Sequence, residues 1–235
     1  MNTGSLSLSV VVPVYYSAAI FPTLYDRLVT TLSGITDNFE IIAVVDGCTD
    51  NSAQVIAEIH QQDQRVKLIE FSRNFGNQMA ITAGLRHTTG DMVVVIDDDL
   101  EDPPEVIAEL VAKAESGGYD VVYATRRERE ISRLKELIFK SYYRVFNHLS
   151  NFEIAENTGD FCLMRRPVVD VLNSMPECNR YVRGLRSWAG FRQTGLEFDR
   201  EVRHSGESGS NLSRYFRFAF DGILSFSQVP LLLST

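Results

Sequence analysis

The sequence contains few cysteines and no long apolar run, and both absences narrow the class of protein. Its three cysteines, Cys48, Cys162 and Cys178, are an odd number without metal-ligand spacing, so we expect ordinary thiols in a reducing cytosol. No run of about 18 apolar residues occurs, which predicts that no segment of this sequence spans a membrane. Residues 8–21 are apolar, but no basic residue precedes them and Pro13 interrupts them, so they do not resemble a signal peptide.

Basic charge is scarce as well. The net charge is −8 at neutral pH, which argues against nucleic acid as the main partner. The chain has 235 residues, of which 44% are hydrophobic. This length and composition suit one α/β domain with a sizeable core, alone or with an appendage.

Apolar runs alternate with stretches of helical spacing through the first half of the chain. This alternation predicts a largely parallel sheet with helices on both faces. In such sheets, ligands bind beyond the carboxyl ends of the strands. The expected strands are 8–14, 40–45, 66–71, 92–96 and 119–125, and the expected helices are 20–32, 51–61, 78–87 and 105–116.

Three aspartates follow the apolar run 92–96 directly. Side chains alternate along an extended chain, so Asp97 and Asp99 should point to one side and Asp98 to the other. Two carboxylates at a strand end suit Mg²⁺ or Mn²⁺, which fill their remaining positions with water and substrate phosphate. Glu101 would add a third oxygen if the extended path continued. The alternative is a solvated acidic turn.

Other polar motifs also follow predicted strands. Tyr15, Asp46 and Arg73 each stand just beyond one, so they should meet the aspartates at one edge of the sheet and bind a nucleotide-like ligand. Structural roles are the alternatives: Asp46 would accept from the backbone of its own turn, and Arg73 and Asn74 would stabilise a loop.

Residues 126–144 have a different character. They carry seven basic residues and three acidic ones, with apolar residues at steps of three and four. A basic amphipathic helix of this kind lies in a membrane interface and favours anionic lipid. The alternative is a helix packed on the domain with a solvated charged face.

Several motifs resemble those of polyprenyl-phosphate glycosyltransferases, a group within glycosyltransferase family two that includes dolichyl-phosphate mannose synthase and the bactoprenol glucosyltransferases. The segment D-D-D-L-E-D-P-P-E at 97–105 is similar to D-x-D-L-Q-x-P-P-E, with Glu101 in place of glutamine. Further matches are P-V-Y at 13–15, V-V-D-G-C-T-D at 44–50, S-R-N-F-G-N-Q at 72–78, N-T-G-D-F-C-L-M-R at 157–165, R-Y-V-R-G-L-R-S-W-A-G-F-R-Q at 180–193 and R-H-S-G-E-S-G-S-N-L at 203–212.

The sequence departs from the family pattern at four further positions. Tyr16 and Ser17 replace asparagine and glutamate near the nucleotide base, Val45 replaces the first aspartate of its motif, and Gly209 replaces a lysine that would contact the diphosphate. We expect the missing diphosphate contact to come from elsewhere, with Arg203 as the candidate.

The resemblance implies a fold of the GT-A type, Rossmann-like and mostly parallel, with added amphipathic interfacial helices. It implies an inverting hexose transfer, with glucose from UDP-glucose expected, to polyprenyl (undecaprenyl) phosphate for cell-surface glycans. Asp160 holds the position of a proposed catalytic base, although it would equally orient the acceptor or a sugar hydroxyl. The implied residues are Asp97, Asp99 and Glu101 for Mg²⁺ or Mn²⁺; Pro13, Tyr15, Ser17, Asp46, Arg73, Asn74, Asp97, Asp98 and Arg203 for the nucleotide sugar; Arg126, Lys140 and Arg183 for the acceptor; and Asp99 and Asp160 for catalysis.

The same resemblance divides the chain into a catalytic domain at 1–210, with a basic amphipathic insertion at about 126–147, and a juxtamembrane amphipathic segment at 211–235. We expect the transmembrane helices that follow in the family to be absent or truncated here. The expected location is the cytoplasmic face of the inner membrane, and a homo-oligomer is left open. Two alternatives stand beside this interpretation: a soluble family-two enzyme with a saccharide acceptor, and a non-catalytic membrane-associated binding protein that keeps the fold.

Overall fold

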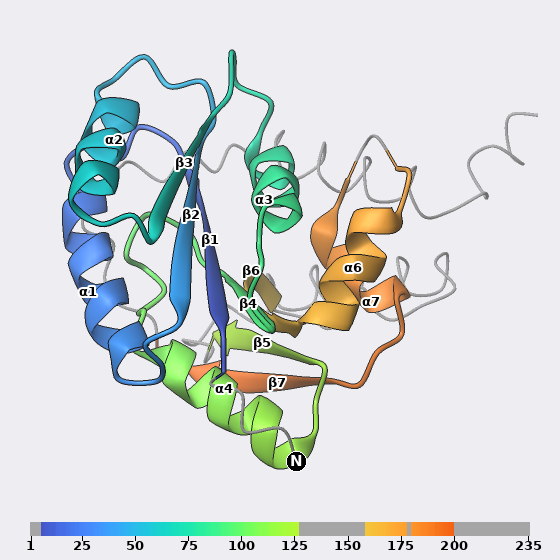
Figure 1. The fold of residues 1–235 in the computed structure, drawn as a ribbon. Coiled ribbons are helices and arrows are strands. Elements are labelled where there is room, and N and C mark those ends of the chain that lie inside the picture. Colours follow the sequence, from blue (N-terminus) through green and yellow to red (C-terminus); the bar gives the residue numbers. More distant parts are fainter. Residues whose placement is uncertain (1–5, 127–157, 178–179, 200–235) are drawn as a thin grey trace, which may run out of the picture.

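The computed structural model describes residues 6–126, 158–177 and 180–199 (Figure 1). The predicted membrane-surface segments at 126–147 and 211–235 lie outside these ranges, except for Arg126 at the end of a strand. Lys140 and Arg203 also lie outside them. Their predicted roles therefore stay predictions.

Seven strands of the described residues form one sheet, in the order β3-β2-β1-β4-β6-β5-β7. β1 to β4 pair in parallel, and β5 pairs in parallel with β7. β6 runs antiparallel to both of its neighbours. The sheet confirms the mostly parallel fold predicted from the sequence. The strands are β1 (Leu8–Val14), β2 (Phe39–Val45), β3 (Val66–Glu70), β4 (Met92–Val95), β5 (Val121–Arg126), β6 (Thr158–Arg165) and β7 (Gln193–Phe198).

Helices cover both faces of this sheet (Figure 1). One core layer packs α1, α2 and α4 against one face, and a second layer packs α3, α6 and α7 against the other. Within the described ranges, no helix is both long enough and apolar enough to cross a lipid bilayer. The helices are α1 (Phe21–Ser33), α2 (Ser52–Gln62), α3 (Asn77–Arg86), α4 (Val106–Gly117), α6 (Arg166–Ser174) and α7 (Val182–Trp188).

Close packing holds α3 against β1 near the C-terminal end of the helix. A Cβ atom at Gly84 would stand 2.3 Å from the Cγ1 atom of Val11, so only glycine lets α3 approach β1 this closely. The sequence predicted α3 and the other helices before residue 117 within one or two residues of their observed bounds. It did not predict β6, α6, α7 or β7, because 157–165 and 180–193 were interpreted only as motifs and the segments between and after them were not assigned.

The strand order reverses between β1 and β4, and Pro13 marks the place. Val14 accepts a hydrogen bond from Asp46 on the β2 side, so the neighbouring Pro13 faces the β4 side. There, pairing of β1 with β4 ends at Val11 and Val95. Because no β4 residue pairs with Pro13, the missing N–H of proline does not remove a hydrogen bond from the sheet. The two strands separate beyond this point, and a cleft between them becomes available at their carboxyl ends.

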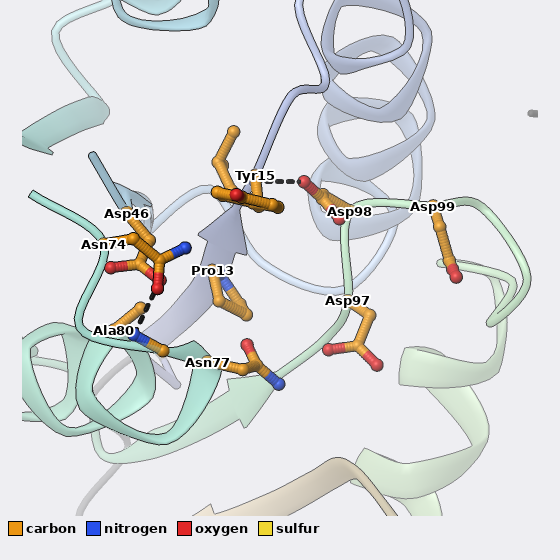
Figure 2. Close-up of a pocket in the computed structure, with 11 residues that line it drawn as sticks. Pro13, Tyr15, Asp46, Asn74, Asn77, Ala80, Asp97, Asp98 and Asp99 are labelled. Carbon is orange, nitrogen blue, oxygen red and sulfur yellow. Dashed lines mark hydrogen bonds between the residues drawn. The ribbon is translucent and has the colours of Figure 1, made fainter. Parts of the chain in front are cut away.

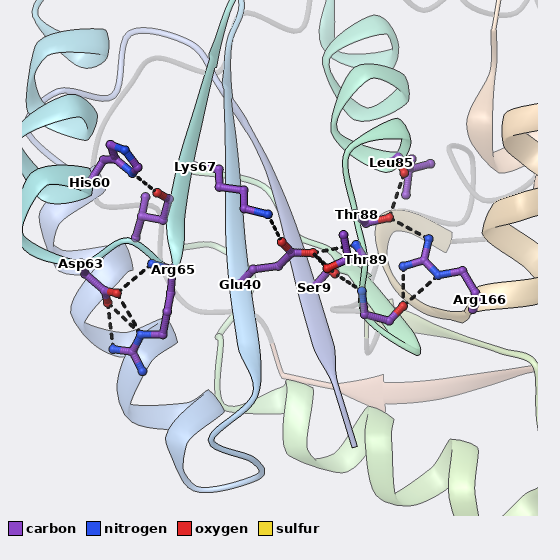
Figure 3. Close-up of polar contacts among 12 residues, drawn as sticks. Ser9, Glu40, His60, Asp63, Arg65, Lys67, Leu85, Thr88, Thr89 and Arg166 are labelled. Carbon is purple, nitrogen blue, oxygen red and sulfur yellow. Dashed lines mark hydrogen bonds and ion pairs between the residues drawn. The ribbon is translucent and has the colours of Figure 1, made fainter. Parts of the chain in front are cut away.

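A buried carboxylate ties the opposite ends of the parallel strands together (Figure 3). Glu40 on β2 accepts hydrogen bonds from the Ser9 hydroxyl on β1 at 2.6 Å and from Lys67 Nζ on β3 at 2.5 Å. It also accepts from the backbone N–H and the hydroxyl of Thr89, just before β4. Burial alone would raise the pKa of Glu40, but these donors outweigh it and lower the pKa to about 2. This cluster fixes four strands at the end remote from the candidate site.

Candidate active site

A pocket of about 320 Å³ lies where β1 and β4 separate (Figure 2). This volume is at the lower end of the range typical of small-molecule sites. Segments from the carboxyl ends of β1, β2 and β4 and from the start of α3 line it, as the strand-end motifs predicted. Its lining residues are Pro13, Val14, Tyr15, Asp46, Asn74, Gly76, Asn77, Ala80, Asp97, Asp98 and Asp99.

The three aspartates after β4 differ in the direction and the contacts of their side chains. Asp98 accepts a hydrogen bond from the backbone N–H of Tyr15 at 2.9 Å and one from the Ser17 hydroxyl at 2.5 Å. Figure 2 shows Asp98 turned toward Tyr15, while Asp97 and Asp99 point to the other side. Asp98 thus fixes the turn after β1, and Asp97 and Asp99 are left facing the pocket.

Negative charge is concentrated at this strand end. Burial raises the pKa of Asp97 to about 8, and the charges of nearby aspartates add to the effect, that of Asp160 first. Burial also raises the pKa of Asp98, although Ser17 and Tyr15 oppose the shift. A cation placed beside Asp97 would therefore be attracted by several carboxylates at once.

The extended path that would have brought Glu101 into line ends at Leu100. Leu100 has a φ of 59°, an unfavourable value for a leucine, and the backbone N–H of Glu101 turns back to Asp99 Oδ1 at 3.0 Å. Glu101 is buried and does not line the pocket. Glu101 was expected to join the metal site only if the extended path continued, and the path does not continue.

The donor set fits a divalent cation that is completed by substrate. In the residues that the structure describes, no three His, Cys, Asp or Glu side chains gather into a metal-binding group. Mg²⁺ and Mn²⁺ commonly use only one or two carboxylates and take their other ligands from water and phosphate. Asp97 and Asp99, both in the pocket wall, supply that number.

Asp46 organises the loop opposite these aspartates. It is 4% exposed, and its two carboxylate oxygens accept the backbone N–H groups of Phe75 and Gly76 at 2.6 and 2.8 Å. A Cβ atom at Gly47 would stand 2.1 Å from the carbonyl carbon of Arg73, so glycine is required for this close approach. Asp46 thus binds the loop 72–76 to the end of β2, a structural role of the kind that the sequence left open.

The turn after β1 presents two aromatic rings. Tyr15 and Tyr16 are 53% and 51% exposed, and their rings meet edge to face with centroids 4.7 Å apart. Tyr16 has a φ of 57°. Its N–H donates to Cys48 Sγ at 3.2 Å and its hydroxyl lies 2.9 Å from the Thr49 hydroxyl. These contacts hold a strained residue at the mouth of the pocket.

Asp160 lies on β6 and joins three elements. Its Oδ1 accepts from Arg183 Nε on α7 at 3.1 Å, and its Oδ2 accepts from Gln78 Nε2 on α3 at 3.0 Å. Asn77 Nδ2, from the pocket wall, is 3.4 Å from the same Oδ2. The side chain of Asp160 is only 8% exposed. The structure therefore brings together Asp160 and Arg183, two residues that the sequence assigned to catalysis and to the acceptor.

The remaining predicted residues are placed as follows. Ser17 is buried behind Asp98. Arg73 is exposed, with its guanidinium 3.9 Å from the centroid of the Phe75 ring, and it does not line the pocket. Arg126 is the last residue of β5, and its backbone pairs with Phe198.

Asn77 and Gln78 were not among the site residues predicted from the sequence. They directly follow the S-R-N-F-G segment and occupy the first turn of α3, so two polar side chains at the start of a helix beside a strand-end motif were the available signal. Asp160 is more than 80 residues away from them in the sequence, so no local sequence pattern indicates this contact.

A mostly parallel sheet with an acidic strand end facing a pocket at the switch point defines the class of GT-A glycosyltransferases. Within that class, the chain belongs to the family described as Glycosyl transferase family 2, whose sequence pattern matches residues 9–172. An uncharacterized glycosyltransferase of Synechocystis sp. is 41% identical over 228 residues, which are 97% of this chain and 71% of the relative. A prophage bactoprenol glucosyl transferase homolog of Escherichia coli is 37% identical over 231 residues, which are 98% of this chain and 75% of that one.

Two solved structures share the fold. A mannosyltransferase of Pyrobaculum calidifontis, in complex with GDP-Man and Mn²⁺, superposes with a TM-score of 0.64 at 18% identity, covering 92% of this chain and 61% of that chain. A glucosyl-3-phosphoglycerate synthase of Mycobacterium tuberculosis, in complex with Mn²⁺, UDP-glucose and glycerol 3-phosphate, gives a TM-score of 0.63 at 21% identity, covering 94% and 79%. At these identities the likeness establishes the fold alone.

Proposed function

We propose that this chain is a metal-dependent, inverting hexosyltransferase that moves glucose from UDP-glucose to polyprenyl phosphate. The observation that carries the proposal is the pocket lined by Asp97, Asp99 and Asn77, together with the Asp160–Arg183 pair that Asn77 contacts through Asp160. The two aspartates in the pocket wall suit a cation with a diphosphate, and the guanidinium of Arg183, joined to the wall through Asp160 and Asn77, suits a phosphate. The name of the Escherichia coli relative supports a glucosyl donor and a bactoprenol acceptor.

The donor side has three parts. Tyr15 and the loop 72–76 border the space for the nucleotide. Asp97 and Asp99 would hold Mg²⁺ or Mn²⁺, which would supply positive charge to neutralise the charge that develops on the departing nucleoside diphosphate. The structural neighbours solved with Mn²⁺ support this use of a divalent cation.

The acceptor supplies its own nucleophile. A phosphate with a second pKa near 6 is already mostly dianionic at neutral pH, so its oxygen attacks the anomeric carbon without a proton transfer. The new bond joins that oxygen to the anomeric carbon, and the bond from the same carbon to the diphosphate breaks. One displacement inverts the centre, so an α-linked donor gives a β-linked product.

The membrane side of the proposal concerns residues outside the described ranges. The segments 126–147 and 211–235 carry the basic and amphipathic patterns that would place the catalytic domain on the cytoplasmic face of the inner membrane. Arg126 and Lys140 would meet the lipid phosphate, and Arg203 the diphosphate. A bactoprenol acceptor, as in the name of the relative, supports a membrane location.

The test is a donor panel assayed with one acceptor. UDP-glucose, UDP-galactose and GDP-mannose are each incubated with undecaprenyl phosphate in detergent, with Mg²⁺, Mn²⁺ or EDTA, and glycolipid and nucleoside diphosphate are quantified. We expect glycolipid from UDP-glucose, and none with EDTA. A parallel incubation supplies saccharide acceptors in place of the lipid, and transfer only there would overturn the lipid assignment. No release of nucleoside diphosphate from any donor in either incubation would identify a non-catalytic protein.

A further inference from the structure

The amide of Gln78 connects α3 to both β6 and α7. Its Oε1 accepts the backbone N–H of Val182 at 2.8 Å, and its Nε2 donates to Asp160 Oδ2 at 3.0 Å. A backbone N–H can only donate, and a carboxylate can only accept. Both neighbours therefore demand the same orientation of the amide, which locks the Gln78 side chain between them.

The Asp160 carboxylate, which Gln78 contacts, has two further donors. Arg183 Nε binds Oδ1 at 3.1 Å, and Asn77 adds a longer contact at 3.4 Å to the oxygen that Gln78 binds. Charged and amide donors on both oxygens hold the Asp160 side chain in one rotamer. A carboxylate held in this way is suited to orient its partners.

We propose that Gln78 is a positioning residue for the transfer, acting through Asp160 to fix the orientation of the Arg183 guanidinium. In this arrangement Asp160 orients the Arg183 side chain. The link to the reacting centre is Asn77, which lines the pocket and contacts Asp160. The inference rests on the proposed function, because Arg183 matters for catalysis only if the acceptor carries an anionic group.

The sharpest perturbation is Gln78→Glu. The variant keeps the shape and an oxygen for Val182, but it replaces the donor that faces Asp160 with a second negative charge. Hydrogen bonds to charged groups are worth enough that we expect kcat to fall by about 10- to 100-fold. KM for UDP-glucose should stay within about twofold, since the donor side is untouched.

The chain offers a matched control in Gln54→Glu. The amide of Gln54 also donates to a carboxylate, that of Glu58, at 2.9 Å. This pair lies on the exposed face of α2, away from the pocket. The control creates the same like-charge contact, so its kcat should equal that of the wild type, and it measures any general effect of the added charge.

Asp160→Asn separates a positioning role from a merely structural one. In the double variant Q78E/D160N, the amide of residue 160 donates to the carboxylate of residue 78, so donor and acceptor are exchanged and the bond is restored. If Gln78 acts through Asp160, adding Q78E to D160N should change kcat by less than about threefold, because coupled residues are not additive. The full 10- to 100-fold loss in the D160N background would overturn the proposal.

Failure of the proposed function gives a different result. If the wild type does not glycosylate undecaprenyl phosphate, the acceptor assignment is wrong. The wild type, Q78E, D160N and Q78E/D160N are then compared in urea unfolding. They are also compared in any transfer or donor hydrolysis that the panel reveals. If the effects of Q78E and D160N on the unfolding equilibrium constant combine independently to within about twofold, the contact between residues 78 and 160 is contradicted. Equal losses of kcat and donor affinity in Q78E would contradict its role on the acceptor side.

Discussion

Replacing Asp46 with asparagine should destabilise the protein and weaken donor binding together. Asp46 is 4% exposed and holds the backbone N–H groups of Phe75 and Gly76 at 2.6 and 2.8 Å. Asparagine keeps one acceptor oxygen and turns an NH₂ group toward the other N–H. One charge-assisted bond is lost, and two donors are left facing each other.

The magnitude follows from these contacts. A hydrogen bond to a charged group contributes about 1.5–3 kcal/mol, and a buried donor left without an acceptor costs a similar amount. We therefore expect Asp46→Asn to lower the free energy of unfolding by about 2–3 kcal/mol. With a urea m-value of about 2 kcal/mol per molar for a small domain, the unfolding midpoint should fall by about 1–1.5 M.

The assay combines urea unfolding, followed by tryptophan fluorescence, with calorimetric titration of UDP-glucose. Asp91→Asn is the matched control. Asp91 also accepts a backbone N–H and a hydroxyl, both from Ser7 at 3.3 and 2.6 Å, but it is exposed at the other end of the sheet. Asp91→Asn should lower the free energy of unfolding by less than about 1 kcal/mol and leave the affinity for UDP-glucose unchanged.

Two results would refute this account of Asp46. A stability change within about 0.5 kcal/mol, as for ordinary surface substitutions, would mean that the loop 72–76 does not depend on it. Weaker donor binding at full stability would mean that Asp46 touches the nucleotide directly, which was the assignment made from the sequence.

Three further predictions concern catalysis, pH and the acceptor. Asp99→Asn should lower the transfer rate by more than about tenfold, or 1.4 kcal/mol, with an unchanged melting temperature; a smaller loss removes Asp99 from metal binding. Glu40 has its pKa lowered to about 2, so its stabilisation, up to about 3 kcal/mol, is complete above pH 4.5 and is lost as pH falls toward 2; urea unfolding of Glu40→Gln between pH 2 and 7 should lack this part of the acid dependence, and a profile parallel to wild type would contradict it. Arg126→Ala and Lys140→Ala should each raise KM for undecaprenyl phosphate but not for UDP-glucose, and together they should lose less than the sum of the single losses; strict additivity would assign Lys140 to lipid headgroups, an effect that added salt would mimic.

The sequence by itself determined the parallel half of the sheet and the position of the site. Strands buried on both faces read as continuous apolar runs, so the run at 92–96 was visible and its aspartates were placed at the correct edge. Side-chain alternation also separated Asp98 from Asp97 and Asp99, because that rule depends only on the extended backbone.

Only the tertiary structure decided the roles of the other polar residues. An apolar run does not reveal the direction of a strand, so nothing local indicated that β6 is antiparallel and carries Asp160 to the start of α3. A positive φ at Leu100 turned Glu101 away from the pocket, and the backbone N–H groups of the loop 72–76 engaged Asp46. Each outcome depends on partners distant in sequence or on a single backbone angle, and neither leaves a periodic pattern in the chain.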